Sequence, residues 1–335
     1  MILTGLAGSG KTKLAQAFAT WICENENQYK IVPVGADWTS REPLFGYPNA
    51  LEHNKYILPD SGVLSLILKA SKSENQNKPY FLILDEMNLS HVERYFADFL
   101  SAMESGEAIP LHSGESDWDG IPPSIKLPEN LFIVGTVNID ETTYMFSPKV
   151  LDRANVIEFR VTEAEMRQYL NSNAKLDLES LRARGASMAA SFVALATDSE
   201  LIATNTDQLR DELLKFFVEL KKSGAEFGYR SASEINRFVA VVNKLEPGWS
   251  QAQIMDAAIM QKLLPKVHGS RKKLEPVLKK LGELCLHDSS VFADYIKNGE
   301  STIASEKIKY PVSMEKIGRM YRALLENSFT SYAEA

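Results

Sequence analysis

The sequence predicts an α/β protein, with a parallel five-stranded sheet sandwiched between helices and an all-helical domain after it. Up to about residue 160, short apolar runs of β-forming residues alternate with helical patterns, as in consecutive βα units. From residue 161 onward only helical patterns follow. The glycine-rich stretch GLAGSGKT joins the first apolar run to the first helical pattern.

Several of the five predicted strands are apolar at nearly every position, which is typical of strands that are covered on both faces. The five are 1–3, 30–34, 80–84, 131–136 and 155–159. Two polar stretches rich in glycine and proline, 36–62 and 105–130, interrupt the alternation. We expect these two stretches to be surface insertions.

The second half of the chain shows helical periodicity in consecutive segments. These are 163–172, 178–196, 207–222, 231–244, 251–264, 271–286 and 313–327. The change of pattern near residue 160 predicts a boundary between an α/β domain, 1–160, and a helical domain, 161–335.

Composition narrows the class of protein. The 335 residues are enough for two domains, and 44% hydrophobic with 24% charged residues is typical of a soluble globular protein. A net charge of −7 argues against a chain coated in positive charge for nucleic acid, although it leaves room for a local basic surface. Cys23 and Cys285 lie in apolar helical contexts, so we expect buried reduced thiols. With no membrane-length apolar run and no signal peptide, a cytoplasmic protein is expected.

The stretch from Gly5 to Thr12 fits the phosphate-loop pattern G-x-x-x-x-G-K-[ST] between a strand and a helix. Its glycines allow successive backbone N–H groups to point at phosphate oxygens, and the helix N-terminus adds partial positive charge. Lys11 would reach the β- and γ-phosphates, and the Thr12 hydroxyl would hold Mg²⁺. An ordinary glycine-rich turn is the alternative. The predicted nucleotide-binding residues are Gly5, Gly8, Ser9, Gly10, Lys11, Thr12 and Asp85.

Two carboxylates end the apolar strand in YFLILDEMN, 80–88. Asp85 stands where open α/β sheets place ligand groups, and we expect it to anchor Mg²⁺ directly or through water. Glu86 would polarise the attacking water as a general base. A solvated strand end with two surface acids is the alternative.

Two further polar residues follow later strands. Asn138 ends LFIVGTVN, 131–138, where its amide could orient the water or touch the γ-phosphate, unless it only forms a turn. Arg153 follows Asp152 just before the fifth strand. Its guanidinium could stabilise transition-state charge at a neighbouring subunit's nucleotide, or it could form an internal salt bridge.

These motifs, followed by a helical domain, resemble the AAA+ ATPases over nearly the whole chain. The stretches LDEMNLSHVERYFADFLSAMESG (84–106), GTVNIDETTYMFSPKVLDRANVIEF (135–159) and FGYRSASEINRFV (227–239) resemble the AAA+ module of McrB-type restriction proteins. The LDR at 151–153 is also similar to the MoxR group, a nearby branch of the same dynein-related clade.

The resemblance implies a role for each polar site residue. Asn138 fits sensor 1, Arg153 fits the arginine finger, and Arg230 in GYRSASE fits the lid arginine called sensor 2. Ser231 and Glu234 have the spacing of a capping box, so we expect Arg230 to lie at a helix start.

The resemblance also implies that each insertion is a hairpin that faces a central pore or a partner. Trp38, Phe45 and Trp118 are then candidate contacts, with plain loop packing as the alternative. The basic run 260–281 is expected to be a solvated helix face, with contact to DNA or a partner as the alternative.

The expected activity is Mg²⁺-dependent hydrolysis of ATP or GTP by a ring, expected to be a hexamer. McrB proteins use GTP, but DEMN is followed here by Leu-Ser where the best-known ones have Arg-Ala, so the nucleotide stays open. No D…E-x-K nuclease pattern is found, so DNA restriction would require a separate McrC-like nuclease subunit. A MoxR-like chaperone that remodels protein complexes is the alternative function, and a degenerate nucleotide-binding scaffold is disfavoured by the intact motifs.

The phosphate loop begins almost at the start of the sequence, with only residues 1–4 ahead of Gly5. A full strand normally precedes such a loop. We therefore expect either a fragment of a longer protein or a start assigned too late. In McrB-like proteins a target-recognition domain usually lies upstream.

Overall fold

The computed structural model describes residues 1–139, 144–172, 177–203, 206–298, 304–333 and 335. The chain forms two compact units. The first is Met1–Val150 with Glu158–Asp198, and the second is Leu151–Ile157 with Ser199–Ala335. The bounds of these two units differ from the predicted domain boundary near residue 160, which stays a prediction.

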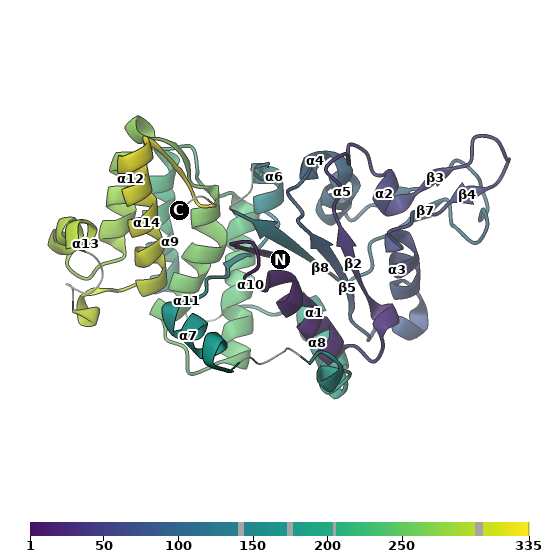
Figure 1. The fold of residues 1–335 in the computed structure, drawn as a ribbon, viewed down its shortest axis with the longest axis horizontal. Coiled ribbons are helices and arrows are strands. Elements are labelled where there is room, and N and C mark those ends of the chain that lie inside the picture. Colours follow the sequence, from purple (N-terminus) through teal and green to yellow (C-terminus); the bar gives the residue numbers. More distant parts are fainter. Residues whose placement is uncertain (140–143, 173–176, 204–205, 299–303, 334) are drawn as a thin grey trace. The chain divides into compact units, whose positions relative to one another are not determined.

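A five-stranded sheet has the order β2-β5-β8-β1-β9, and all but the last of these strands belong wholly to the first unit (Figure 1). The strands of the sheet are β1 (Ile2–Gly5), β2 (Tyr29–Pro33), β5 (Tyr80–Asp85), β8 (Leu131–Asn138) and β9 (Val156–Glu158). The pairs β2–β5, β5–β8 and β1–β8 are parallel. The predicted parallel α/β sheet is thus confirmed, and the wholly apolar β5 is buried from Tyr80 to Leu84.

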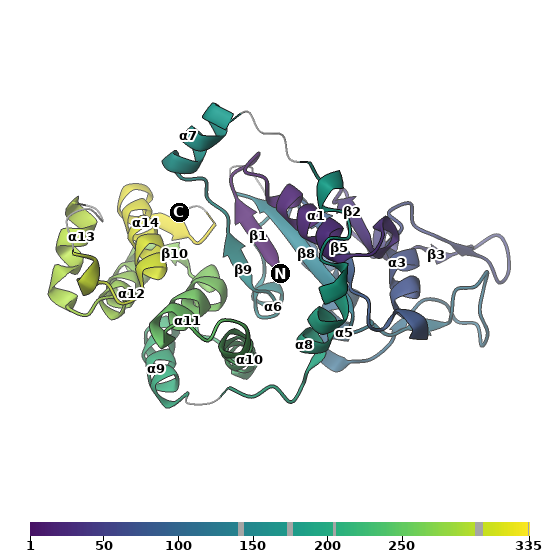
Figure 2. The ribbon, with the colours of Figure 1, turned by 90° about the horizontal axis from the view of Figure 1, so that it is seen from below.

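Helices cover both faces of this sheet (Figure 2). Helix α1 (Lys11–Ile22) packs on β1, β5 and β8, and its Ala15, Ala19 and Ile22 share a core cluster with Ile83 of β5. Helix α3 (Val63–Ala70) packs on β2 and β5. Three short helices complete this part of the unit: α4 (Val92–Tyr95), α5 (Ala97–Ser105) and α6 (Pro148–Leu151).

The stretch Glu158–Asp198 packs with the sheet. It contains α7 (Glu163–Ser172), two 3₁₀ turns (Glu179–Leu181 and Ala186–Met188) and α8 (Ala189–Thr197). The ring of Phe192 in α8 lies 4.7 Å from that of Phe132 and 5.8 Å from that of Phe18. These ring contacts hold α8 against the sheet and make the stretch part of the first unit.

The helix predicted over 178–196 is wrong in its first half. The N–H groups of Ala183 and Gly185 donate to the carbonyls of Thr20 and Trp21 at the end of α1, at 3.0 and 2.8 Å. Ala183 also has a φ of 54°, in the left-handed region. These tertiary hydrogen bonds replace the local ones that a continuous helix requires.

Both predicted insertions contain a short antiparallel hairpin. The first carries α2 (Glu42–Phe45) with β3 (Tyr47–Pro48) and β4 (Tyr56–Ile57), and the second carries β6 (Ile109–Pro110) and β7 (Ser124–Ile125). The hairpins extend together from the first unit (Figure 1), and Lys55 Nζ lies 3.2 Å from Asp119 Oδ1 between them.

The three aromatic residues singled out in the two insertions are packed within the first unit. Phe45 is fully buried with its ring 4.9 Å from that of Phe99, Trp118 stacks on His112 at 4.2 Å, and Trp38 packs edge-on against Tyr95. Loop packing therefore accounts for all three, and contact with a pore or partner stays a prediction.

The second unit consists mainly of helices (Figure 1). They are α9 (Asp207–Lys221), α10 (Tyr229–Leu245), α11 (Gln251–Ala258), α12 (Arg271–Leu284), α13 (Phe292–Asn298) and α14 (Pro311–Asn327). A π-helical turn, Ile259–Leu263, continues α11. The helices predicted in this part agree closely with α9 to α12 and α14.

Two features of the second unit were not predicted. One is α13, and the other is a two-stranded antiparallel ribbon of β10 (His268–Ser270) and β11 (Phe329–Ser331). Each ribbon strand has only three residues, too few for an alternating pattern to show in the sequence. The expectation of a wholly helical second part is corrected by this ribbon.

Both cysteines are buried and free, as predicted. Burial raises the pKa of the Cys23 thiol to about 12, so this thiol stays protonated at neutral pH. Among the described residues, no helix combines the length and apolar character needed to cross a membrane.

Candidate active site

The strand register brings the predicted site residues of the first unit to one edge of the sheet. Gly5, at the end of β1, pairs with Asn138 at the end of β8. The neighbouring strand β5 ends at Asp85. Because these strands run parallel, their carboxyl ends meet, and this is the edge where α/β sheets bind ligands.

The loop from Gly5 to Thr12 turns sharply between β1 and α1. Gly8 and Gly10 have φ of 74° and 91°, which glycine adopts at little cost. A Cβ added at either position would meet no described atom within 4 Å, so the loop faces open space there. Ser9 Oγ donates to the carbonyl of Leu6 at 2.8 Å, inside the loop. The first turn of α1 carries no acidic residue, which leaves its partial positive charge available to an anion.

Lys11 lies inside the loop. Only 4% of Lys11 is exposed, and its Nζ donates to the carbonyls of Gly5 at 2.9 Å and Leu6 at 2.6 Å. These two carbonyls accept hydrogen bonds from the buried ammonium. Lys11 is thus placed to attract a phosphate group at the mouth of the loop.

Thr12 and Asp85, the two predicted metal ligands, are in direct contact. Thr12 Oγ1 donates to Asp85 Oδ1 at 2.5 Å. A hydroxyl and a carboxylate converging on one point are hard oxygen donors of the kind that Mg²⁺ prefers. The described residues hold no cluster of three or more metal-binding side chains, and a Mg²⁺ bound through one carboxylate plus phosphates needs none.

Glu86 and Asn138 also meet. Asn138 Nδ2 donates to Glu86 Oε1 at 3.1 Å. The backbone of Glu86 has a φ of 54°, a left-handed conformation that costs a non-glycine residue about 1–2 kcal/mol. Such strain is typical of functional positions. The residue predicted to orient water therefore contacts the residue predicted to activate it.

Thr136 is a site residue that sequence reasoning missed. Its Oγ1 donates to Asp85 Oδ1 at 2.7 Å and accepts the N–H of Glu86 at 3.1 Å. One hydroxyl thus fixes both acidic residues. The sequence carried a signal, because Thr136 is a polar residue in an otherwise apolar strand and lies on the same face as Asn138, two residues later.

We expect Thr136→Val to keep nucleotide binding but to lower kcat about tenfold, because Asp85 and Glu86 lose their shared anchor. Stability should fall by about 1–3 kcal/mol, because the Glu86 N–H loses its acceptor. Steady-state kinetics and urea unfolding measure the two effects. Thr20→Val is the matched control, because Thr20 is also buried and bonded, to Tyr29, but not to an acid. A wild-type kcat in Thr136→Val would remove Thr136 from the site.

Arg153 and Arg230 belong to the second unit, so the geometry of the first unit does not test their predicted roles. Arg230 is exposed and is the second residue of α10, which agrees with a position at a helix start. The capping box predicted from Ser231 and Glu234 is wrong. The N-cap is Gly228, and Ser231 lies inside the helix with its hydroxyl 3.4 Å from Asp152 Oδ1.

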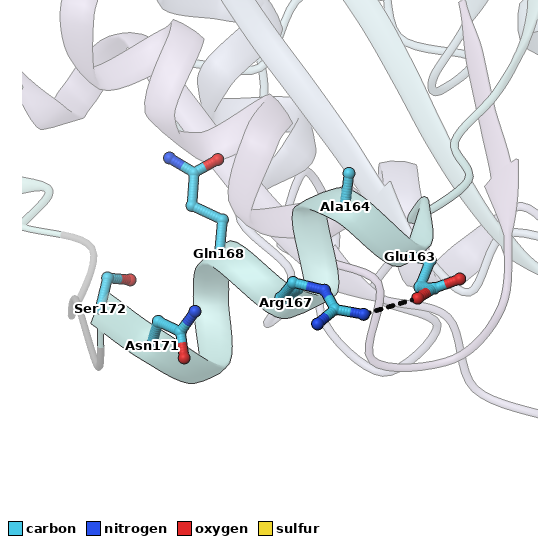
Figure 3. Close-up of a pocket in the computed structure, with 6 residues that line it drawn as sticks. All are labelled: Glu163, Ala164, Arg167, Gln168, Asn171 and Ser172. Carbon is cyan, nitrogen blue, oxygen red and sulfur yellow. Dashed lines mark hydrogen bonds and ion pairs between the residues drawn. The ribbon is translucent and has the colours of Figure 1, made fainter.

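A shallow hollow lies along α7 (Figure 3). Its lining residues are Glu163, Ala164, Arg167, Gln168, Asn171 and Ser172. All of them belong to one helix without a buried residue, and the ion pair between Arg167 and Glu163 spans one turn of it. The hollow shares no residue with the predicted site and carries no argument for a ligand.

The basic run 260–281 is only partly the solvated face that the sequence predicts. Its α12 lysines are exposed: Lys272, Lys273, Lys279 and Lys280. Lys262 and Lys266, by contrast, are 3% and 8% exposed. The Nζ of Lys262 has no hydrogen-bond partner among the described residues, and burial lowers its pKa from 10.5.

We expect Lys262→Met to stabilise the protein at pH 7 by about 1 kcal/mol. The substitution removes a buried charge, and the attraction of Glu234 and Asp152 does not offset the cost of burying it. The wild-type protein should become more stable as pH rises from the lowered pKa towards 10.5, because only the unfolded chain then holds the proton. Lys266 repels the same charge. Urea unfolding at pH 7 and pH 10 tests this, with the exposed Lys279→Met as control. Destabilisation at pH 7 would contradict it.

Comparisons with known proteins support the fold. Residues 177–329 match a protein family described as "Domain of unknown function (DUF8727)". No curated protein matches the sequence. Among solved structures, the chain is similar to a "putative ATPase" from Cytophaga hutchinsonii, with a TM-score of 0.51 and 12% identity over 78% of this chain and 76% of that one. At this identity the likeness concerns the fold, and it agrees with a parallel α/β sheet flanked by helices and followed by a mainly helical part.

Proposed function

We propose that this protein is a Mg²⁺-dependent nucleoside triphosphatase of the AAA+ type. The observation that carries the proposal is the pair of contacts at the carboxyl edge of the sheet, Thr12 with Asp85 and Asn138 with Glu86. These contacts support the proposal, because a hydroxyl and a carboxylate of the kind that Mg²⁺ prefers lie next to a carboxylate that accepts a hydrogen bond from an amide. The structural neighbour is described as a "putative ATPase", and its shared fold supports the same proposal.

The reaction would be in-line attack of water on the γ-phosphate. Lys11 and the loop N–H groups would hold the phosphates, and Glu86, oriented by Asn138, would accept the proton of the attacking water. Mg²⁺ bound at Thr12 and Asp85 would neutralise charge on the phosphate oxygens. Positioning and charge neutralisation would supply most of the rate enhancement.

The finer proposal is a ring, hexameric in its simplest form, in which Arg153 acts on a neighbour's nucleotide and Arg230 on its own. The wording of the motifs at 84–106, 135–159 and 227–239 supports an McrB-type role, in which hydrolysis drives work on DNA with a separate nuclease subunit. The LDR at 151–153 supports the alternative, a MoxR-like ATPase that remodels protein complexes. ATP and GTP are both candidates for the nucleotide.

The proposal is tested by measuring binding and hydrolysis of ATP and GTP by the purified protein, with Mg²⁺ and with EDTA. We expect Mg²⁺-dependent release of phosphate from at least one nucleotide. A protein that binds neither nucleotide in the presence of Mg²⁺ would overturn the proposal. Stimulation by double-stranded DNA would favour the McrB-type role, and its absence the remodelling role.

A further inference from the structure

A partly buried polar cluster in the second unit joins three segments that are far apart in the sequence. The Lys266 ammonium donates to Asp152 Oδ1 and to Ser231 Oγ, the latter at 3.0 Å. Ser231 Oγ lies 3.4 Å from the same Asp152 oxygen. Ser231 is completely buried and the side chain of Lys266 is 7% exposed, whereas the side chain of Asp152 is 37% exposed. These three side chains, Asp152, Ser231 and Lys266, are called the Lys266 bridge below.

The bridge lies next to both predicted arginines. Asp152 immediately precedes Arg153, and Ser231 immediately follows Arg230. One ammonium group therefore ties together the two backbone segments that carry the proposed arginine finger and the proposed lid arginine. Both segments belong to the second unit.

Stability does not explain a lysine at this position. Burying the ammonium of Lys266 costs solvation, and its pairing with Asp152, whose side chain is 37% exposed, repays this cost only in part. An apolar side chain of similar length at position 266 would fill the same volume without that cost. Buried ion pairs that do not stabilise a fold can instead fix one arrangement of the segments they join.

We propose that Lys266 is a positioning residue that holds Arg153 and Arg230 in one fixed relation. This inference rests on the proposed function. In a ring where Arg153 serves the neighbouring nucleotide and Arg230 serves its own, the bridge makes the two arginines move together. A movement of Arg230 at one nucleotide site would then shift the position of Arg153 at the neighbouring site.

The first test measures nucleotide hydrolysis by three single variants, Lys266→Met, Arg153→Ala and Arg230→Ala. It also measures hydrolysis by the two double variants that combine Lys266→Met with either arginine substitution. Lys266→Met is expected to lower kcat about 100-fold with little change in the KM, because positioning errors of about 1 Å have effects of this size. Adding Lys266→Met to Arg153→Ala should cause little further loss, because the bridge acts through the arginine. Losses that multiply in full, or a wild-type kcat, would overturn the inference.

The second test does not depend on activity. Hydrogen exchange should show weaker protection of the amides in 151–157 in Lys266→Met, with α12 unchanged. Lys279→Met is the matched control, because Lys279 is exposed on α12 and forms no part of the bridge. If Lys266→Met does not fold, Ser231→Ala, which removes one bond of the bridge without leaving a hydrophobic mismatch, takes its place. Unchanged protection of 151–157 would overturn the inference.

A mixing experiment separates this inference from the proposed function. Subunits with Lys11→Ala lack a working site but still offer Arg153, so mixing them with Arg153→Ala subunits should restore hydrolysis. Subunits carrying both Lys11→Ala and Lys266→Met should fail to restore it. If the wild-type protein hydrolyses no nucleotide, the proposed function has failed. If it does and the double variant still restores activity, only the inference about Lys266 has failed.

Discussion

Glu86→Gln should bind nucleotide as the wild-type protein does but hydrolyse it about 100- to 10,000-fold more slowly, the range expected for loss of a general base. The amide cannot accept the proton of water. It can still accept the hydrogen bond that Asn138 Nδ2 donates to Oε1 at 3.1 Å, so the local geometry should survive. Single-turnover hydrolysis and equilibrium binding of a labelled nucleotide measure the two properties separately.

The control for this variant is Glu24→Gln. Glu24 is a partly exposed acid of the same unit, paired with Lys78 at 2.7 Å, and its loss should leave both binding and hydrolysis unchanged. Hydrolysis by Glu86→Gln at the wild-type rate would show that Glu86 is not the base. Loss of binding in Glu86→Gln would show instead that this side chain holds the nucleotide.

Gly5→Ala should destabilise the first unit by about 3 kcal/mol and abolish nucleotide binding, because a well-packed site cannot accept an added carbon without backbone movement. A Cβ at Gly5 would lie 2.2 Å from the carbonyl oxygen of Phe159, and the φ of Gly5 is 153°. The Phe159 N–H donates to the carbonyl of Thr4, so the clash would disturb β1 where the loop begins. Urea unfolding and nucleotide binding are the measurements.

Gly8→Ala is the matched control for stability. Gly8 also has a positive φ, 74°, but no described atom lies within 4 Å of the Cβ it would gain. Its cost should therefore be the conformational strain alone, about 1 kcal/mol. Equal losses of stability in the two variants would show that the contact with Phe159 does not govern the loop.

The sequence alone predicted those parts of the fold that local patterns encode. The buried strand 80–85 is apolar at every position but the last, and the phosphate loop is defined by residues within eight positions of one another. The helices of the second unit were also predictable from local sequence. In an amphipathic segment such as Asp207–Lys221, apolar residues recur at helical spacing within the segment itself. The stretch 178–196 carried a similar pattern, yet hydrogen bonds to the carbonyls of Thr20 and Trp21 keep its first half out of the helix, which begins only at Ala189.

Only the tertiary structure decided which polar groups meet. The residue types at 85, 86 and 138 suggested chemistry, but the contact of Asn138 with Glu86, and the anchoring of both acids by Thr136, follow from the register of β5 and β8. Likewise, Lys266 looked like a surface lysine until the fold placed it against Asp152 and Ser231. The physical reason is that periodicity reports only on neighbours within a few residues, whereas hydrogen bonds between distant segments depend on how strands and helices are packed.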